Sequence, residues 1–186
     1  DIAATLEFMG KIQMKQCKYD KAYECFVEGL ECRQASLGTD NPLCGESFHF
    51  LGVSSRKKGE FDRAISFLLD ALHIRKSLVD QSYTVETMKE IGHVYRQSGD
   101  SDDALGCYEK CVEILLTQFG ETDERLCDIL IPLGHVNKDL GRLDDAKDCY
   151  KKALNIKLQT YRKDSIHCSR EHRSIGMLRY QLGEYD

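Results

Sequence analysis

Two histidines follow a glycine in the same local context, GHV, and are the first residues to consider as metal ligands. His93 and His135 lie at matching places in the chain, and imidazole nitrogens are common zinc ligands. Adjacent structural units could bring both side chains within reach of one ion. The alternative is a polar surface position copied by repeat duplication, and we favour that interpretation.

Other reactive side chains have similarly simple explanations. Cys107 and Cys111 are four residues apart on an expected helix and could form half of a metal site, but no histidine lies within a turn of them. The pair Asp102–Asp103 stands where a helix begins, as does Asp144–Asp145, and carboxylates are favourable there without any catalytic role. No GxSxG, HExxH or glycine-rich phosphate loop occurs. The sequence therefore predicts a non-enzymatic protein with no metal and no cofactor.

One pattern positions all of these residues. LGHVNKDLGRLDDA at Leu133–Ala146 recurs at Met9–Ala22, Leu51–Ala64 and Ile91–Ala104, and a partial copy begins at Ile175. The first glycines, separated by 42, 40, 42 and 42 residues, are Gly10, Gly52, Gly92, Gly134 and Gly176. A fixed period of this length indicates a repeat array in which each unit contacts mainly its neighbours. We predict a single array over 1–186, with units at about 3–44, 45–84, 85–126 and 127–168 and a partial unit at 169–186, as a fragment of a longer protein.

Apolar residues recur at three- and four-residue spacing on both sides of the second glycine of each unit, which is typical of paired amphipathic helices. This spacing predicts nine helices, at 2–16, 20–36, 43–58, 61–77, 83–98, 101–118, 124–140, 143–159 and 166–182. The repeated first glycine and the repeated alanine are expected where two helices cross closely. Pro132 is expected to kink its helix or delay its start to near Leu130. Cys17 replaces the glycine that should end the first helix, so that turn is expected to be strained or differently closed.

Nine cysteines occur, an odd number, and none forms a CxxC pair. Cys25, Cys107 and Cys149 each come three residues after the repeated alanine, which predicts one buried packing slot on successive helices. Reduced thiols favour an intracellular, cytoplasmic protein. No apolar run approaches the ~18–20 residues of a membrane span.

The motif resembles the tetratricopeptide repeat: Leu133-Gly134, Gly141, Asp144, Ala146, Tyr150 and Ala153 match its pattern of small and aromatic positions. The 42-residue form resembles the repeats of kinesin light chain and nephrocystin-type proteins. This resemblance implies an all-α fold, a right-handed α-solenoid of antiparallel helix pairs. It also implies that the first helices line a concave surface, where kinesin light chain binds cargo peptides.

Basic side chains recur on the predicted inner face although the net charge is −5. Helical spacing places them in rows around the first glycine. The predicted peptide-binding groove comprises Lys11, Lys15, His49, Arg56, Lys57, Lys89, His93, Arg96, His135, Lys138 and Arg173. Neither Arg56 nor Arg96 is expected in the core. An ordinary solvated face is the alternative, and acids such as Glu46 and Glu86 are explained by helix starts.

We therefore predict a protein-interaction scaffold that binds an extended acidic peptide or a partner helix in a basic groove. The alternative is a regulatory or self-associating arm of a larger signalling protein, such as an NTPase with its catalytic domain elsewhere. Self-association through the last helix, 166–182, is also expected. The pI near 5.7 argues against nucleic-acid binding.

Overall fold

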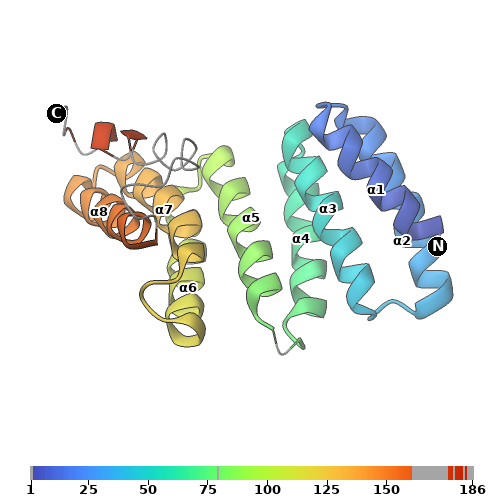
Figure 1. The fold of residues 1–186 in the computed structure, drawn as a ribbon. Coiled ribbons are helices and arrows are strands. Elements are labelled where there is room, and N and C mark those ends of the chain that lie inside the picture. The colour runs from blue at the N-terminus through green and yellow to red at the C-terminus, as the bar shows by residue number, and fades with distance from the viewer. Residues whose placement is uncertain (1, 79, 161–175, 178, 182, 184–186) are drawn as a thin grey trace, which may run out of the picture. The chain divides into compact units, whose positions relative to one another are not determined.

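The computed structural model describes residues 2–78, 80–160, 176–177, 179–181 and 183. Every regular element bounded within these residues is a helix (Figure 1). The elements are α1 (Ile2–Lys15), α2 (Tyr19–Leu37), α3 (Pro42–Lys58), α4 (Phe61–Arg75), α5 (Ser82–Ser98), α6 (Ser101–Phe119), the 3₁₀ turn η1 (Glu124–Leu126), α7 (Cys127–Asp139) and α8 (Leu143–Thr160). No described helix is both long and apolar enough to cross a bilayer.

The chain divides into two compact units, Asp1–Ser98 and Gly99–Asp186. In unit 1 each of the helices α1 to α4 packs against the next one along the chain, and in unit 2 α7 packs against both α6 and α8. The predicted bounds of the first eight helices are confirmed to within a few residues. The ninth predicted helix, 166–182, lies mainly outside the described residues.

Close helix crossing at the first glycine is confirmed in three repeats. A Cβ atom added at Gly10 would lie within 3.0 Å of the Phe26 ring, and one at Gly52 would approach the Leu68 side chain as closely. Gly134 meets the ring of Tyr150 in the same way. The cost of a glycine inside a helix, up to ~1 kcal/mol, is therefore offset by closer packing of the second helix.

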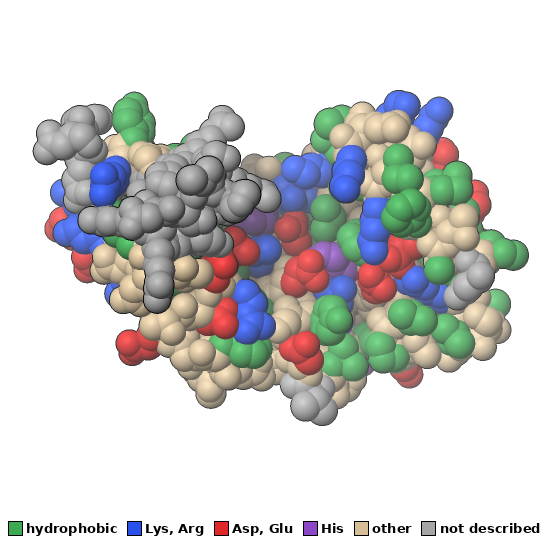
Figure 2. Space-filling view, in the orientation of Figure 1, with side chains coloured by type: hydrophobic (Ala, Val, Ile, Leu, Met, Phe, Trp, Pro, Cys, Tyr) green, Lys and Arg blue, Asp and Glu red, His purple; other side chains and the backbone are tan. Residues whose placement is uncertain are grey.

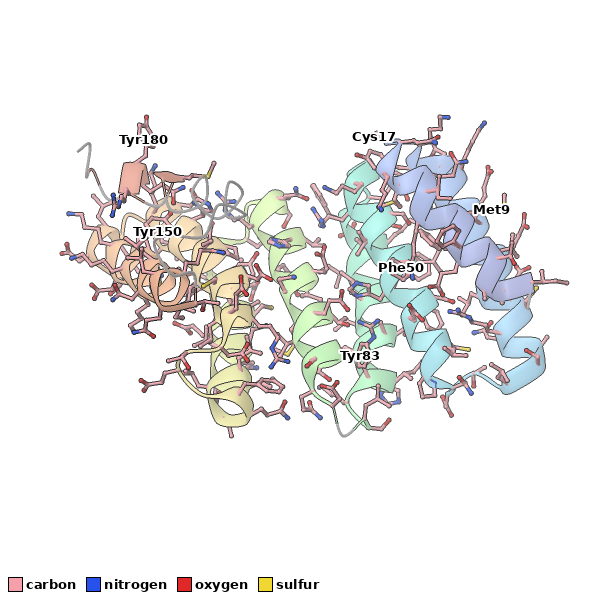
Figure 3. All side chains as sticks on the ribbon, in the orientation of Figure 1. Met9, Cys17, Phe50, Tyr83, Tyr150 and Tyr180 are labelled. Atoms are coloured by element: carbon pink, nitrogen blue, oxygen red, sulfur yellow. The ribbon has the colours of Figure 1, made fainter. Side chains whose placement is uncertain are left out.

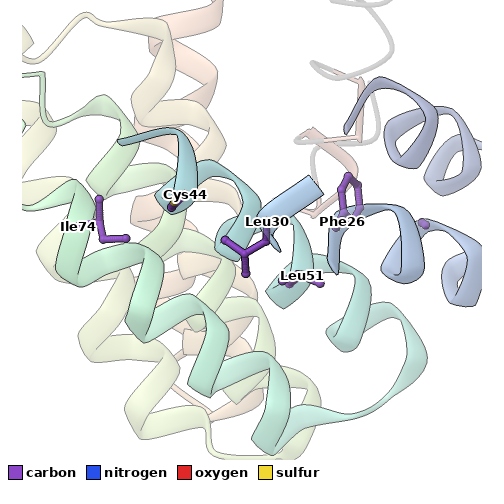
Figure 4. Packing of buried hydrophobic residues seen from close by; sticks show 6 residues of the cluster. Phe26, Leu30, Cys44, Leu51 and Ile74 are labelled. Atoms are coloured by element: carbon purple, nitrogen blue, oxygen red, sulfur yellow. The ribbon is translucent and has the colours of Figure 1, made fainter. Parts of the chain in front are cut away.

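The core of unit 1 forms where the helix pairs stack on one another. Phe26 and Leu30 from α2 share a buried cluster with Cys44 and Leu51 from α3 and with Ile74 from α4 (Figure 4). The Phe26 ring also stacks on Phe50, with ring centroids 5.2 Å apart. The cluster is continuous across the first two repeats, so each of these two repeats stabilises the other.

The predicted cysteine slot is only partly correct. Cys149 is buried, but Cys25 and Cys107 are half-buried. Some cysteines outside this slot are more deeply buried. Cys127 is fully buried, and burial raises the pKa of its thiol to about 11. Each cysteine in the described part of the chain is a free thiol.

Of the two outcomes expected for Pro132, a kinked helix or a start delayed to near Leu130, the delayed start is wrong. The turn η1 occupies the predicted first turn, Asp123 accepts a hydrogen bond from the backbone of Arg125 at 3.0 Å, and α7 then runs from Cys127 through Pro132. The carbonyl that Pro132 leaves without a helical partner is that of Asp128. Asp128 is exposed, so water can satisfy this carbonyl and the helix continues.

The strained turn expected at Cys17 is confirmed. Its φ is 58°, in the left-handed region, and the residue lies at the end of α1 (Figure 3). Lys18 N donates to Gln13 O at 2.9 Å, as Glu60 N donates to Ser55 O at 2.9 Å in the next repeat, where Gly59 takes the place of Cys17. The first repeat therefore keeps the turn geometry of the second without its glycine.

Cys17→Gly is expected to raise the free energy of unfolding by about 0.5–1 kcal/mol. The left-handed conformation costs a non-glycine residue about 1–2 kcal/mol, and part of the gain is lost to the larger unfolded-state entropy of glycine. The measurement is the urea unfolding midpoint. Cys17→Ala is the matched control because it removes the thiol and keeps the strain. An equal gain in both variants would show that the thiol, not the backbone, is responsible.

Candidate functional site

The helices α1, α3 and α5 lie side by side in unit 1 and present the side chains of the predicted groove. Lys11 Nζ on α1 lies 3.3 Å from Glu46 Oε1 on α3, and Arg56 Nε on α3 donates to Glu90 Oε2 on α5 at 3.1 Å. We call this surface the odd-helix face. Figure 2 shows acidic and basic side chains interspersed over it.

The first predicted groove residue, Lys11, is already paired. It bridges Glu7 and Glu46, and its ammonium lies 4.4 Å from the centroid of the Phe50 ring. Burial disfavours ionised Glu7, but the hydrogen bond from Lys11 and the nearby Arg33 guanidinium outweigh burial and hold its pKa below the usual value. Lys11 therefore connects α1 to α3 through its ion pairs, and its charge is already balanced by carboxylates of unit 1.

Arg56 was expected outside the core, and that expectation is wrong. Its exposed fraction is 9%, and its guanidinium also donates to Gln97 Oε1 at 3.2 Å. Spacing along α3 correctly places Arg56 on the odd-helix face. The burial of Arg56 depends on α5, because Glu90 and Gln97 on that helix contact its guanidinium. The spacing of residues along α3 alone cannot predict those contacts.

Two buried arginines were missed by the groove prediction, and the first is Arg33 on α2, which is 5% exposed. It donates to the carbonyl of Leu43 at 2.7 Å and to Ser47 Oγ at 2.8 Å, and it forms an ion pair with Glu7. One side chain thereby connects α1, α2 and the first turns of α3.

Arg75 forms an equivalent set of contacts in the next repeat of unit 1. It is 3% exposed, donates to the carbonyl of Tyr83 at 3.2 Å and to Thr87 Oγ1 at 2.7 Å, and lies 3.4 Å from Glu86. Arg33 and Arg75 each come eleven residues after the repeated alanine, Ala22 or Ala64. That shared offset on an otherwise apolar face is the sequence signal that could have identified them.

Unit 2 has apolar residues at the two equivalent positions. Counting from the repeated alanine and glycine, Leu115 replaces the arginine and Ile129 replaces the hydroxyl residue. Both are 1% exposed. The repeat therefore accepts either a hydrogen-bonded arginine or a pair of aliphatic side chains at this position.

The predicted histidine donors of unit 1 are enclosed rather than adaptable surface groups. His49 is 3% exposed, with Nδ1 3.4 Å from Thr87 Oγ1 and Nε2 3.9 Å from Glu86. Burial, reinforced by Arg75 and Lys89, lowers its pKa to about 3. Burial likewise lowers the pKa of half-buried His93 to about 4, although Glu90 opposes the shift.

Three lysines of the predicted groove differ from the residues above. Lys15 and Lys57 are exposed and Lys89 is half-buried. Within the described residues, none of the three ammonium groups has a hydrogen bond or an ion pair. Arg96 is exposed on α5. Unpaired cations on the odd-helix face are therefore fewer than the sequence suggests.

The remaining groove residues belong to unit 2. Half-buried His135 contacts the hydroxyl of Tyr150, with Nδ1 and Oη 2.9 Å apart, and Lys138 is exposed on α7. Arg173 lies outside the described residues. His93 and His135 fall in different units, and no group of three or more potential metal-ligating side chains occurs among the residues that the structure places.

The family model for the tetratricopeptide repeat matches residues 1–77, 56–117 and 83–159, so the chain belongs to this family. Such repeats are protein–protein interaction scaffolds and are generally non-catalytic. A curated relative, the photosystem I assembly protein Ycf3 of Prochlorococcus marinus, is 23% identical over 94 residues, 50% of this chain and 51% of that protein. The chain thus matches about half the length of this relative.

Solved structures confirm the all-α solenoid class. BtubC (BKLC) from P. vanneervenii superposes with a TM-score of 0.77 at 19% identity, covering 99% of this chain and 75% of that one. The kinesin light chain-like repeats of Podosopora anserina superpose with a TM-score of 0.76 at 14% identity, covering 98% and 87%. The predicted resemblance to kinesin light chain-like repeats is therefore confirmed at the level of the fold.

Proposed function

We propose that the odd-helix face of unit 1 binds an extended acidic segment of another protein through Lys15, Lys57 and Lys89. The observation that carries this proposal is the division of the basic residues into two sets. Lys11, Arg33, Arg56 and Arg75 are held by carboxylates of the same unit, whereas the three lysines have no such partner among the described residues.

The positions of these lysines suit an elongated ligand. Lys15 and Lys57 occupy the same place in adjacent repeats, five residues after Gly10 and Gly52. Lys89 stands on the next helix of this face, so the three charges come from α1, α3 and α5 in turn. A ligand that pairs with all of them must cross three helices, which an extended acidic segment can do.

The test is a titration of a fluorescently labelled peptide of alternating glutamate and serine, measured by anisotropy. Replacing Lys15, Lys57 and Lys89 together by glutamate is expected to weaken binding by about tenfold or more, because each exposed pair contributes about 0.2–1 kcal/mol and reversal adds repulsion. Binding should also weaken with salt as the Debye length falls from ~30 Å at 0.01 M to ~8 Å at 0.15 M.

The control variant reverses Lys21, Lys76 and Lys110, which lie on or beside even-numbered helices and change the net charge equally. It should bind the peptide as the unaltered protein does, apart from a small general charge effect. Equal losses in both triple variants, or no binding by the unaltered protein at low salt, would reject the odd-helix face as the site.

A further inference from the structure

Unit 2 contains a partly open cavity of about 320 Å³ between α6, η1, α7 and α8. Its floor is apolar, formed by Leu126, Leu130 and Ile156, and one wall consists of Val112 and Leu116 on α6. Leu116 is 41% exposed. The cavity has the size of a small ligand site, and each described residue that lines it belongs to unit 2.

The apolar lining of the cavity differs from the equivalent positions of unit 1. The positions of unit 1 equivalent to Val112, Leu126, Leu130 and Ile156 are Leu30, Cys44, Phe48 and Ile74. Those four side chains pack in or against the core cluster of unit 1, where Phe48 also stacks near Phe67 with centroids 6.4 Å apart. Unit 2 has the smaller Leu130 at the position of Phe48 and the larger Leu126 at the position of Cys44, so the apolar lining of the cavity is specific to unit 2.

The second wall of the cavity is polar and belongs to α8. Asn155 and Gln159 are exposed and lie one helical turn apart, with Lys152 on the same side. Side chains spaced by four residues on a helix are about 5–6 Å apart, close to the ~6.6–6.8 Å that separates alternate residues of an extended chain. Their amides can therefore both donate to and accept from the backbone of an extended peptide.

The rim carries one charge of each sign. Lys152 stands on α8, and Glu121 stands in the loop between α6 and η1. Both are exposed, and neither forms an ion pair with another described residue. A ligand matched to this rim would carry an acidic group near Lys152 and a basic group near Glu121.

We propose that this cavity, which we call the α6–α8 pocket, binds a short extended peptide segment of another protein. The segment inserts an apolar side chain over Leu126 and Leu130. Its backbone bonds to Asn155 and Gln159, and an acid and a base flank the apolar residue. This site is separate from the odd-helix face and involves none of its lysines.

The probe is a phage-displayed library of short random peptides, selected on the intact chain, with recovered peptides measured by anisotropy. Recovered peptides should share an apolar residue flanked by one acid and one base. Leu130→Phe, which restores the residue type of position 48, should weaken their binding by about tenfold or more, because it occupies the space of one buried apolar side chain. Lys152→Glu should weaken binding, whereas Lys151→Glu, an exposed neighbour outside the cavity, should not.

Leu116→Asn provides a second test at a more exposed position in case Leu130→Phe does not fold. It too should weaken binding, because the apolar wall is lost. The proposal is overturned if the library yields no binder, or if the recovered peptides bind a folded Leu130→Phe or Leu116→Asn variant as tightly as the unaltered chain. If replacing Lys15, Lys57 and Lys89 by glutamate weakens the binding of the recovered peptides instead, those peptides bind the odd-helix face and not the cavity.

Discussion

Arg33→Leu is expected to lower the free energy of unfolding of unit 1 by about 3–5 kcal/mol, the range for removing one partner of a buried ion pair. The guanidinium bonds Leu43 O and Ser47 Oγ and pairs with Glu7, whose side chain is 10% exposed. Its loss leaves a buried carboxylate with Lys11 alone and removes the donor to Ser47 Oγ, whereas Leu43 O still accepts from Ser47 Oγ at 3.4 Å. Urea unfolding followed by circular dichroism measures the loss, and hydrogen exchange should locate it in α1 to α3.

Arg75 offers a matched comparison in the next repeat. Arg75→Leu should cost less, about 2–3 kcal/mol, because its acidic partner Glu86 has a side chain that is 49% exposed and can return to water. The double variant Arg75→Leu with Thr87→Ile introduces the residue types of the equivalent positions in unit 2, Leu115 and Ile129, which are both buried. Well-packed apolar residues often replace a buried polar contact without loss, so the double variant should recover most of the stability.

The two arginine variants separate two explanations. If the arginines act mainly by hydrogen bonding and charge, the double variant is more stable than Arg75→Leu alone. If they act mainly by filling space with their aliphatic stems, both leucine variants should be nearly neutral. Losses below about 1 kcal/mol for Arg33→Leu would contradict the assigned role.

Acidification from about pH 7.5 to about pH 5 is expected to destabilise unit 1, with His49 contributing about 2 kcal/mol. The pKa of His49 falls from 6.5 to about 3 on folding, so the unfolded chain binds a proton more readily than the folded one. The stability contributed by neutral His49 is therefore complete above pH 6.5 and is lost progressively as the pH falls towards 3. His93, whose pKa is lowered to about 4, acts in the same direction.

The groups around His49 explain why protonation is unfavourable. Burial has the largest effect, and the positive charges of Arg75 on α4, Lys89 on α5, Arg56 on α3 and Lys11 on α1 add to it. Glu86 is the acid nearest to the ring, 3.9 Å from Nε2, but its side chain is half exposed. Four cations thus outweigh one solvated carboxylate.

His49→Gln removes the titrating group while keeping a side chain that can contact Thr87. The loss of unfolding free energy between about pH 7.5 and about pH 5 should shrink by about 2 kcal/mol relative to the unaltered chain. His73→Gln, at an exposed position on α4, is the control and should preserve the full pH dependence. Identical pH profiles for His49→Gln and the unaltered chain would contradict the assignment.

The helices and their pairing could be predicted from the sequence because the signals are local. Periodic apolar residues define each helix, and left-handed glycines such as Gly59 and Gly141 end the first helices. The repeated glycine at Gly52 predicts that a second helix crosses closely there, although the sequence does not name the contacting residue, Leu68. Even the strain at Cys17 follows from the repeat, because a glycine stands there in the other copies. These features depend on neighbours within a few residues or on comparison between copies.

The ionisation and availability of the groove residues were decided only by tertiary structure. Spacing placed Lys11, Arg56 and Lys57 on one face, but only the neighbouring helices determine that Lys11 and Arg56 meet carboxylates while Lys57 meets none. Long charged side chains reach across to helices more than thirty residues away in sequence, and their pKa values depend on burial there. The α6–α8 pocket has the same origin, because its lining comes from α6, η1, α7 and α8, which only the fold brings together.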